Sequence, residues 1–168
     1  MGFIPTASQT DETYLKEAKQ ELVDLGIKQK HITTIQLDHQ ILYKEITSCD
    51  ALYVCGGNTF YLLAKARESG FIAVAHQFVQ SGKVYVGVSA GSILAGPDIS
   101  IALQGDENDI GISDFTGLDL TNIVVWPHYT KKEEAVVAEY KKKLKFPVVP
   151  LTDQQALVID GDTKKLIE

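Results

Sequence analysis

The chain has 168 residues and a formal net charge of −6 at pH 7, and its mean hydropathy is close to zero. This length suffices for one domain with a full hydrophobic core that needs no disulfide or metal to hold it together. Lys and Arg are scattered along the sequence, so no basic stripe is available to bind nucleic-acid phosphates.

Neither the N-terminal residues nor the cysteines show a feature typical of an exported protein. The N-terminal residues lack a basic region ahead of an apolar stretch, and no apolar run is long enough to span a bilayer. Cys49 and Cys55 have the spacing of no metal or redox motif, and Cys55 ends an apolar run that predicts a buried structural thiol. We therefore expect a cytoplasmic protein with no membrane or nucleic-acid partner.

Apolar, β-branched runs that predict strands alternate with segments that carry apolar residues at helical spacing. The predicted strands are residues 2–8, 31–37, 51–55, 83–88, 98–103 and 122–128. The predicted helices are residues 13–25, 39–49, 59–69, 71–82, 90–96 and 133–144, with Thr10-Asp11 offering the N-cap of the first. This alternation predicts an α/β fold, with a parallel sheet covered on both faces by helices.

The remaining segments are a loop and a C-terminal group of strands. Residues 104–121 are polar, acidic and Gly-rich, which is typical of a long loop. Residues 146–151 and 156–160 predict strands, and Gly161-Asp162 a turn. We expect residues 148–168 to form a small antiparallel addition, within a single domain that spans residues 1–168.

Polar or glycine-rich residues follow three of the predicted parallel strands. Gly56 to Thr59 follow the strand at 51–55, Ser89 follows the strand at 83–88, and His128 ends the strand at 122–128. Ligands of such sheets bind outside the carboxyl ends of the strands. We therefore expect these three features to meet at one edge of the sheet.

Gly87-Val88-Ser89-Ala90-Gly91 is a G-x-S-x-G sequence between a predicted strand and a predicted helix. This context is typical of a nucleophilic serine on a tight turn, where small neighbours are required and helix N–H groups can stabilise an oxyanion. The spacing alone fits a structural turn serine equally well.

A nucleophilic serine needs a base and an acid that orients it. His128 ends an apolar strand behind Pro127, which makes it the best-placed base, although a histidine at the rim of a site would have the same pattern. His31, His39 and His76 fit surface, capping or helix positions. Several loop carboxylates could serve as the acid, and the pattern does not choose among them: Asp106, Glu107, Asp109 and Asp114.

The segments YVCGGNTFYLL, VGVSAGSILAGP and WPHY, in this order and spacing, resemble the peptidase E family of serine peptidases, which includes aspartyl dipeptidases and, more distantly, cyanophycinases. The resemblance extends from FIPTA to ALVIDG, nearly the whole chain. It implies a class I glutamine-amidotransferase-like, flavodoxin-like three-layer fold and a Ser-His-acid triad. It places the nucleophile on Ser89 and the base on His128. Through NDIGISDFTG it places the acid on Asp109, with Glu107 in reserve.

The resemblance also implies a substrate site without metal or organic cofactor. The amides of Gly57 and Ala90 would form the oxyanion hole, and Asn58 would contact a small peptide substrate. A homodimer is compatible with it. Two departures stand out: the family's strand and helix before FIPTA are lacking, and the Gly-Glu-Thr-Arg type motif of aspartyl dipeptidases is replaced by HYTKKEEAVVAEY. Because an Asp side chain is usually held by a bidentate Arg and none follows His128, the sequence leaves strict Asp-X specificity open.

Two functions follow from these residues. The leading hypothesis is a serine peptidase, dipeptidase- or aminopeptidase-like, that hydrolyses small peptides through an acyl-enzyme. The alternative is a non-catalytic protein on the same fold that binds a small molecule or peptide. Amidotransferase-type cysteine chemistry is excluded because the turn holds Ser89.

Overall fold

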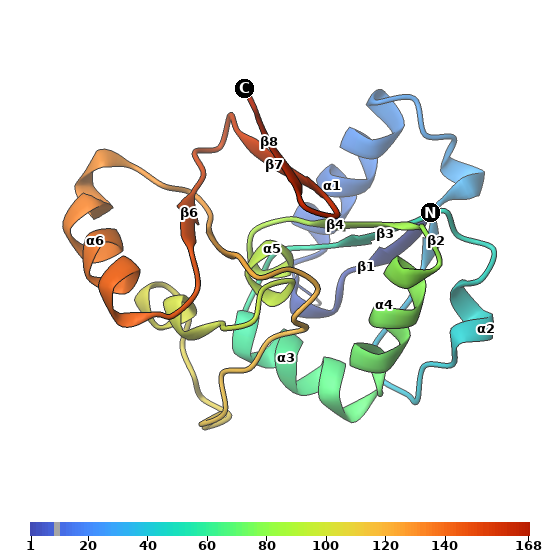
Figure 1. Cartoon of the computed structure of the whole chain (residues 1–168). Coiled ribbons are helices and arrows are strands. Elements are labelled where there is room, and N and C mark those ends of the chain that lie inside the picture. The colour runs from blue at the N-terminus through green and yellow to red at the C-terminus, as the bar shows by residue number, and fades with distance from the viewer. Residues whose placement is uncertain (9–10) are drawn as a thin grey trace.

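A computed structural model of the chain describes residues 1–8 and 11–168 (Figure 1). The strands are β1 (Gly2–Ile4), β2 (Thr33–Thr34), β3 (Ala51–Val54), β4 (Val84–Gly87), β5 (Val124–Trp126), β6 (Val148–Pro150), β7 (Ala156–Asp160) and β8 (Thr163–Ile167). The α-helices are α1 (Glu12–Asp24), α2 (Tyr43–Ile46), α3 (Thr59–Glu68), α4 (Phe71–Gln80), α5 (Ala90–Leu94) and α6 (Glu134–Lys143). The 3-10 helices are η1 (Thr6–Ser8), η2 (Gln29–His31), η3 (Ser100–Gln104) and η4 (Lys131–Glu133).

The main sheet contains four parallel strands in the order β2-β1-β3-β4. Strands β5 and β6 form a second parallel pair, and β7 and β8 form an antiparallel hairpin. Because the helices connect parallel strands, the chain has the predicted mostly parallel α/β architecture.

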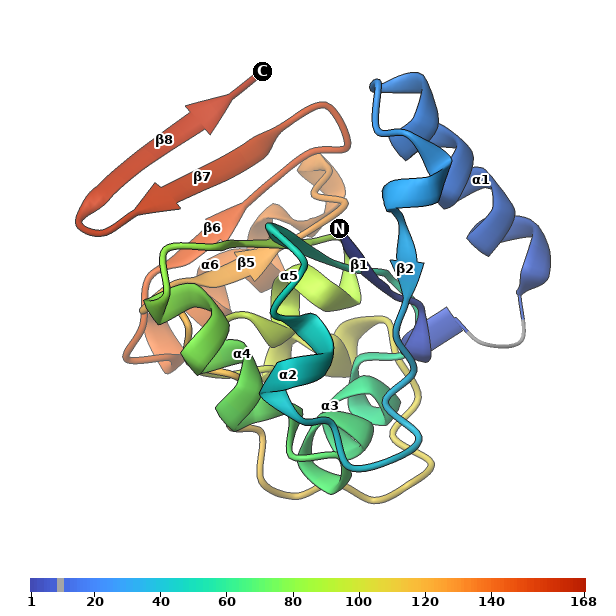
Figure 2. The same cartoon turned by 90° about the vertical axis from the view of Figure 1, so that its right-hand side faces the viewer.

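Alternate residues of each strand supply two separate cores on the two faces of the main sheet. On one face, Phe3 stacks on Tyr53 with ring centroids 5.7 Å apart, and Ala18 and Leu22 of α1 pack beside them. On the other face, Ile4 of β1 and Leu52 and Val54 of β3 belong to the larger core, which lies under α3 and α4. Figure 2 shows α1 on one side of the sheet and α2, α3 and α4 on the opposite side, which gives the three layers.

Two predicted elements differ from the structure between residues 39 and 103. The predicted strand at 98–103 is wrong: the segment forms η3, and only Asp98 bridges Thr116. Its alternating apolar residues, among them Ile99 and Ile101, are buried in a turn instead of a sheet, an ambiguity inherent in short apolar runs. The predicted helix at 39–49 shortens to α2.

The C-terminal segment was predicted as a wholly antiparallel addition, which is wrong for its first strand. Strand β6 pairs in parallel with β5, with Val124 opposite Val148, whereas only β7 and β8 are antiparallel. At the other end of the chain, Asp11 caps α1 by accepting a hydrogen bond from the Tyr14 N–H at 2.9 Å. Thr10, the other predicted cap residue, lies outside the described residues.

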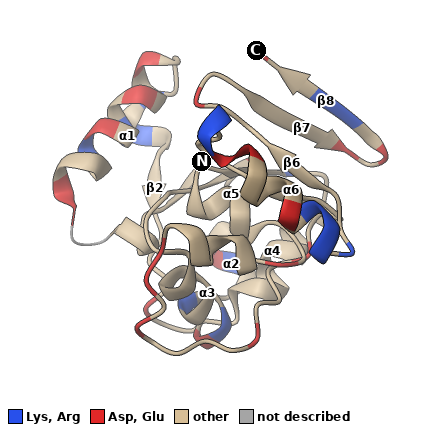
Figure 3. Ribbon diagram, turned by 90° about the vertical axis from the view of Figure 1, so that its left-hand side faces the viewer, with Lys and Arg blue, Asp and Glu red and all other residues tan. Residues whose placement is uncertain are grey.

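Charged residues are distributed over several elements. Figure 3 shows basic segments on α3, α6 and β8, with acidic residues interspersed. Within residues 1–8 and 11–168, no helix has the length and apolar character needed to cross a membrane.

Candidate active site

Ser89 lies in the tight connection between β4 and α5. Its backbone has φ 49° and ψ −114°, a conformation that non-glycine residues rarely adopt. The small residues around it are required by packing, since a Cβ atom on Gly91 would lie 2.2 Å from the Val54 carbonyl oxygen. The G-x-S-x-G sequence therefore forms a strained strand-to-helix turn that presents the Ser89 side chain at the carboxyl end of the sheet.

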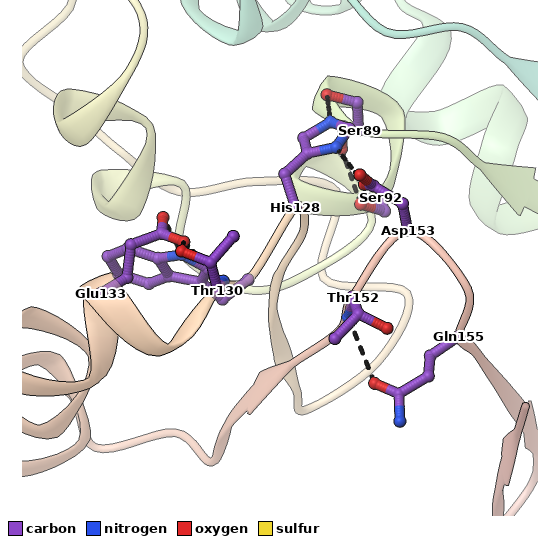
Figure 4. A network of polar contacts seen from close by, with 9 residues as sticks. Ser89, Ser92, His128, Thr130, Glu133, Thr152, Asp153 and Gln155 are labelled. Carbon is purple, nitrogen blue, oxygen red and sulfur yellow. Dashed lines mark hydrogen bonds and ion pairs between the residues drawn. The ribbon is translucent and has the colours of Figure 1, made fainter.

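His128 lies immediately beyond β5 and faces Ser89 (Figure 4). Its Nε2 atom is 2.9 Å from the Ser89 hydroxyl oxygen. The backbone of His128 also has a positive φ, 55°, directly after Pro127. The two residues that the sequence predicted as nucleophile and base are thus in hydrogen-bond contact.

Asp153 contacts the other nitrogen of the His128 ring. Its Oδ1 atom lies 2.6 Å from Nδ1 of His128 (Figure 4). Asp153 follows β6 in a turn in which the Gln155 side chain accepts a hydrogen bond from the Thr152 N–H at 3.1 Å. An Asp153 carboxylate that accepts from Nδ1–H leaves Nε2 to accept the Ser89 proton.

The pairing of β5 with β6 positions these two side chains. The Leu151 N–H donates to the Trp126 carbonyl, and the Tyr129 N–H donates to the Leu151 carbonyl, both at 2.8 Å. These bonds continue the parallel ladder past the ends of both strands. The residues that follow each strand, His128 and Asp153, therefore lie side by side at the same edge.

The predicted acid is corrected by this arrangement. Asp109 and Glu107 line a different cavity, together with Asn58 and Tyr61. Both nitrogens of His128 are already engaged by Ser89 and Asp153. The resemblance predicts the acid in the acidic loop, whereas the carboxylate that contacts the histidine follows the neighbouring parallel strand.

The two other acidic-loop candidates have partners of their own. Asp106 Oδ2 accepts a hydrogen bond from the Thr59 N–H at 2.8 Å, at the start of α3. Asp114 forms an ion pair with Arg67 at 3.1 Å. A backbone hydrogen bond from Thr116, together with that guanidinium, holds the pKa of Asp114 below its usual value.

The Gly56-Gly57-Asn58 turn packs against Ser89, as the convergence of strand ends predicted. A Cβ atom on Gly56 would lie 3.0 Å from the Ser89 Cβ atom. The Gly56 peptide is held from both sides, because its N–H donates to the Tyr14 hydroxyl at 3.1 Å and its carbonyl accepts from the Ser8 hydroxyl. Gly57 has φ 131°, and a side chain there would collide with the Ala7 carbonyl.

Asn58 is predicted to contact substrate, and in the structure its side chain makes two hydrogen bonds within the protein. Its Oδ1 atom accepts from the Tyr61 N–H and caps α3, while its Nδ2 atom donates to the Glu107 carbonyl, both at 2.8 Å. Asn58 therefore connects the glycine turn to the acidic loop.

Comparison with known proteins gives the family. The sequence profile of peptidase family S51 matches residues 1–167. The chain belongs to peptidase family S51, and it is a serine-type peptidase.

The sequences of the relatives align with nearly the full length of this S51 peptidase. An uncharacterized peptidase of Pasteurella multocida (strain Pm70) is 31% identical over 173 residues, which cover 96% of this chain and 82% of the relative. A peptidase E of Shewanella amazonensis (strain ATCC BAA-1098 / SB2B) is 33% identical over 177 residues, covering 98% of this chain and 73% of the relative.

Solved structures confirm the fold. A crystal structure of a Listeria monocytogenes EGD-e protein assigned to peptidase E superimposes with a TM-score of 0.79 at 24% identity, covering 99% of this chain and 84% of that one. A peptidase from an acI-B1 Actinobacterium gives a TM-score of 0.71 at 18% identity, covering 99% of this chain and 73% of that one. The S51 peptidase therefore has the flavodoxin-like architecture expected from its sequence.

A cavity of about 190 Å³ opens beside Ser89 and His128 in this S51 peptidase. Its apolar wall consists of Ile93, Ile101, Ala102 and Trp126, and its polar lining includes Thr59, Gln104, Asp106 and Glu133. The apolar residues come from α5, η3 and β5, so the cavity is formed where these elements meet the carboxyl end of the sheet.

Glu133 is oriented by three donors at the rim of this cavity (Figure 4). Its carboxylate accepts from the Trp126 indole N–H at 3.2 Å and from the Thr130 N–H and hydroxyl at 2.7 and 3.2 Å. Partial burial opposes ionisation, but the hydrogen bonds from Thr130 and Trp126 outweigh it and lower the pKa of Glu133. The cavity next to Ser89 therefore has an ionised carboxylate at neutral pH.

Proposed function

We propose that this S51 peptidase hydrolyses short peptides through an acyl-enzyme on Ser89, in the manner of a dipeptidase or aminopeptidase. The observation that carries the proposal is the continuous hydrogen-bond chain from Ser89 through His128 to Asp153. A serine hydroxyl becomes a useful nucleophile when a base accepts its proton and an acid orients that base. The strained backbone of Ser89 supports the same role, since such strain clusters at reacting residues.

In the first half of the reaction, Ser89 Oγ attacks the peptide carbonyl carbon while its proton passes to Nε2 of His128. The Asp153 carboxylate stabilises the resulting imidazolium through Nδ1–H. The tetrahedral intermediate then collapses, the C–N bond breaks, and His128 gives its proton to the leaving amine. In the second half, His128 takes a proton from water, which attacks the ester carbonyl carbon. The C–Oγ bond then breaks, His128 returns its proton to Ser89 Oγ, and the acid is released.

The Gly57 and Ala90 N–H groups are the proposed donors to the oxyanion. Ala90 follows Ser89 in the chain, and the turn that contains Gly57 packs against Ser89 through Gly56. Among the described residues, no backbone carbonyl accepts a hydrogen bond from either N–H group. Donors that are already in place when negative charge develops contribute strongly to acyl-transfer catalysis.

The cavity of about 190 Å³ beside Ser89 can take up one substrate side chain, which is compatible with short peptides. The name peptidase E given to several relatives supports peptide bonds as the substrate, without indicating peptide length. A cytoplasmic location is part of the proposal, and the two buried, free cysteines are compatible with a reducing compartment.

The deciding experiment combines active-site labelling with turnover. The purified protein is treated with a fluorophosphonate and analysed by intact mass and peptide mapping, and a panel of dipeptides and tripeptides is assayed in parallel. We expect one adduct, on Ser89, and loss of both adduct and turnover in Ser89→Ala. Ser81→Ala, at the distant end of α4, is the matched control and should behave as the wild type. Absence of an adduct on Ser89, with turnover unchanged in Ser89→Ala, would refute the proposal.

A further inference from the structure

Two carboxylates, Asp106 and Glu133, line the cavity next to Ser89. Both side chains are half-buried. In the described part of the chain no Lys or Arg lines this cavity, and Lys131 and Lys132, which precede Glu133 on η4, are exposed outside its lining. The cavity is therefore an anionic environment, enclosed on one side by apolar residues.

Both carboxylates are held in place and keep capacity to accept further hydrogen bonds. Asp106 uses its Oδ2 atom to accept from the Thr59 N–H. Glu133 accepts from Trp126 and Thr130, and the lowered pKa of its carboxyl keeps it charged. An ionised carboxylate offers about four acceptor sites. A ligand with N–H donors could thus bind without displacing the existing bonds.

A third polar residue, Thr59, belongs to the same cavity lining. Thr59 is fully buried and lines the cavity, yet its hydroxyl has no hydrogen-bond partner among the described residues. A buried hydroxyl without a partner is unfavourable, and such groups are rare in folded proteins. The Thr59 N–H, in contrast, is paired with Asp106, which ties this residue to one of the two carboxylates of the cavity.

We propose that this cavity selects peptides that place a cationic group, an ammonium or a guanidinium, between Asp106 and Glu133. The inference rests on the proposed peptidase function and adds the substrate class. A lysine or arginine side chain would lay its methylene groups against Ile93, Ile101 and Trp126 and bring its charged end to the carboxylates. A free peptide amino terminus carries the same charge. An acidic residue would meet two like charges and be disfavoured.

The first test compares substrates that differ in charge at constant shape. Peptides with lysine, norleucine or glutamate at the same position are assayed with a free and with an acetylated amino terminus. We expect kcat/KM to be roughly tenfold or more higher for a cationic peptide than for its neutral counterpart, the size of a hydrogen-bonded charge pair. A preference for lysine over norleucine identifies the side chain as the cation, whereas a loss on acetylation identifies the amino terminus.

The second test measures binding without turnover, so that it is independent of the chemistry. The lysine and norleucine peptides, free and acetylated, are titrated into Ser89→Ala by calorimetry. Asp106→Asn and Glu133→Gln, each combined with Ser89→Ala, should reduce the cationic preference several-fold. Asp106→Asn retains an oxygen for the Thr59 N–H, which guards against a merely structural effect. Glu134→Gln is the matched control, because Glu134 is adjacent in sequence but exposed and outside the cavity lining.

The two proposals fail in distinguishable ways. If wild-type Ser89 is labelled and peptides are cleaved, but cationic and neutral peptides bind and react equally, the cation proposal is wrong and the peptidase proposal stands. If Ser89→Ala binds cationic peptides preferentially while the wild type neither cleaves them nor becomes labelled, the cavity assignment stands and the catalytic one is wrong. Equal preference in Asp106→Asn, Glu133→Gln and Glu134→Gln would also overturn the cation proposal.

Discussion

Asp153 Oδ1 lies 2.6 Å from His128 Nδ1, and the two residues follow adjacent parallel strands, β6 and β5. The side chains of His128 and Asp153 are 63% and 69% exposed, so the contact is open to water. In such a setting the carboxylate acts mainly by fixing the tautomer and orientation of the imidazole, because solvent screens its charge.

Asp153→Asn should therefore lower kcat by about 10²–10⁴-fold, because the asparagine amide can donate to Nδ1 and stabilise the wrong tautomer. Peptide turnover and the rate of fluorophosphonate labelling at Ser89 measure the effect. Asp109→Asn is the matched control, and its activity should stay within about twofold of wild type, as for other exposed substitutions. A large loss in Asp109→Asn with little change in Asp153→Asn would reverse this assignment.

Tyr14→Phe tests whether the glycine turn must be held in place for catalysis. The change removes the acceptor of the Gly56 N–H without altering the ring. We expect kcat to fall roughly tenfold with KM nearly unchanged, since the proposed oxyanion donor, the Gly57 N–H, is displaced and not removed. Tyr43→Phe, which loses only an exposed contact to Ser81, is the control. An unchanged kcat in Tyr14→Phe would show that the turn keeps its position without this bond.

Gly91→Ala should destabilise the protein by about 3 kcal/mol or more, at the upper end of overpacking effects. The added methyl group would lie 2.2 Å from the Val54 carbonyl oxygen, and neither backbone segment can yield without moving the Ser89 turn. Denaturant unfolding measures the change. In Gly105→Ala the methyl group meets open space, and the free energy of unfolding should change by less than about 1 kcal/mol. Equal stabilities of the two variants would contradict the close approach.

Cys55 should resist alkylation in the folded protein. Burial raises the pKa of its thiol to about 12 from an ordinary value of 9.0, and the charge of Lys19 opposes this rise. At pH 8 the native thiol should react with iodoacetamide roughly a thousandfold more slowly than in denaturant, because only the thiolate is nucleophilic. Peptide mapping separates Cys55 from Cys49.

The same shift predicts a pH dependence of stability. The folded state retains the Cys55 proton that the unfolded chain releases above pH 9. This contribution is therefore complete below pH 9 and is lost as the pH rises towards 12. Rapid alkylation of the native protein at pH 8, or a stability that rises over this alkaline range, would be incompatible with a buried Cys55.

Several parts of the site follow from local sequence patterns. The strand before Ser89, the helix after it and the position of His128 behind a strand all obey the rule that parallel strands end at one edge. The same rule applied to residues 146–151 would have drawn attention to Asp153, two residues beyond that strand. The local pattern, however, predicts an antiparallel addition for this part of the chain, and the rule holds only for parallel strands. Strand direction depends on long-range pairing, here of Val124 with Val148, which local patterns do not encode.

The cavity cannot be predicted from the sequence either, because it too depends on contacts between distant parts of the chain. Residues 98–103 alternate like a strand, but their apolar side chains fill a turn beside α5 and form part of the cavity wall. Glu133 is the first residue of the amphipathic helix predicted at 133–144, and the pattern does not distinguish it from its charged neighbours. Its role depends on the Trp126 indole, seven residues away, and on Thr130, so it emerges only from the folded chain.

Ser89 and His128 share a positive φ, and each such conformation costs on the order of 1–3 kcal/mol in a non-glycine residue. Glycine at either position would relieve that cost and remove the reacting side chain. The protein is therefore less stable than it could be because of the backbone conformation of the two residues at which its chemistry is proposed to occur. Selection for thermal stability alone would favour replacing these two residues, so stabilising substitutions that keep both side chains have to be sought elsewhere in the fold.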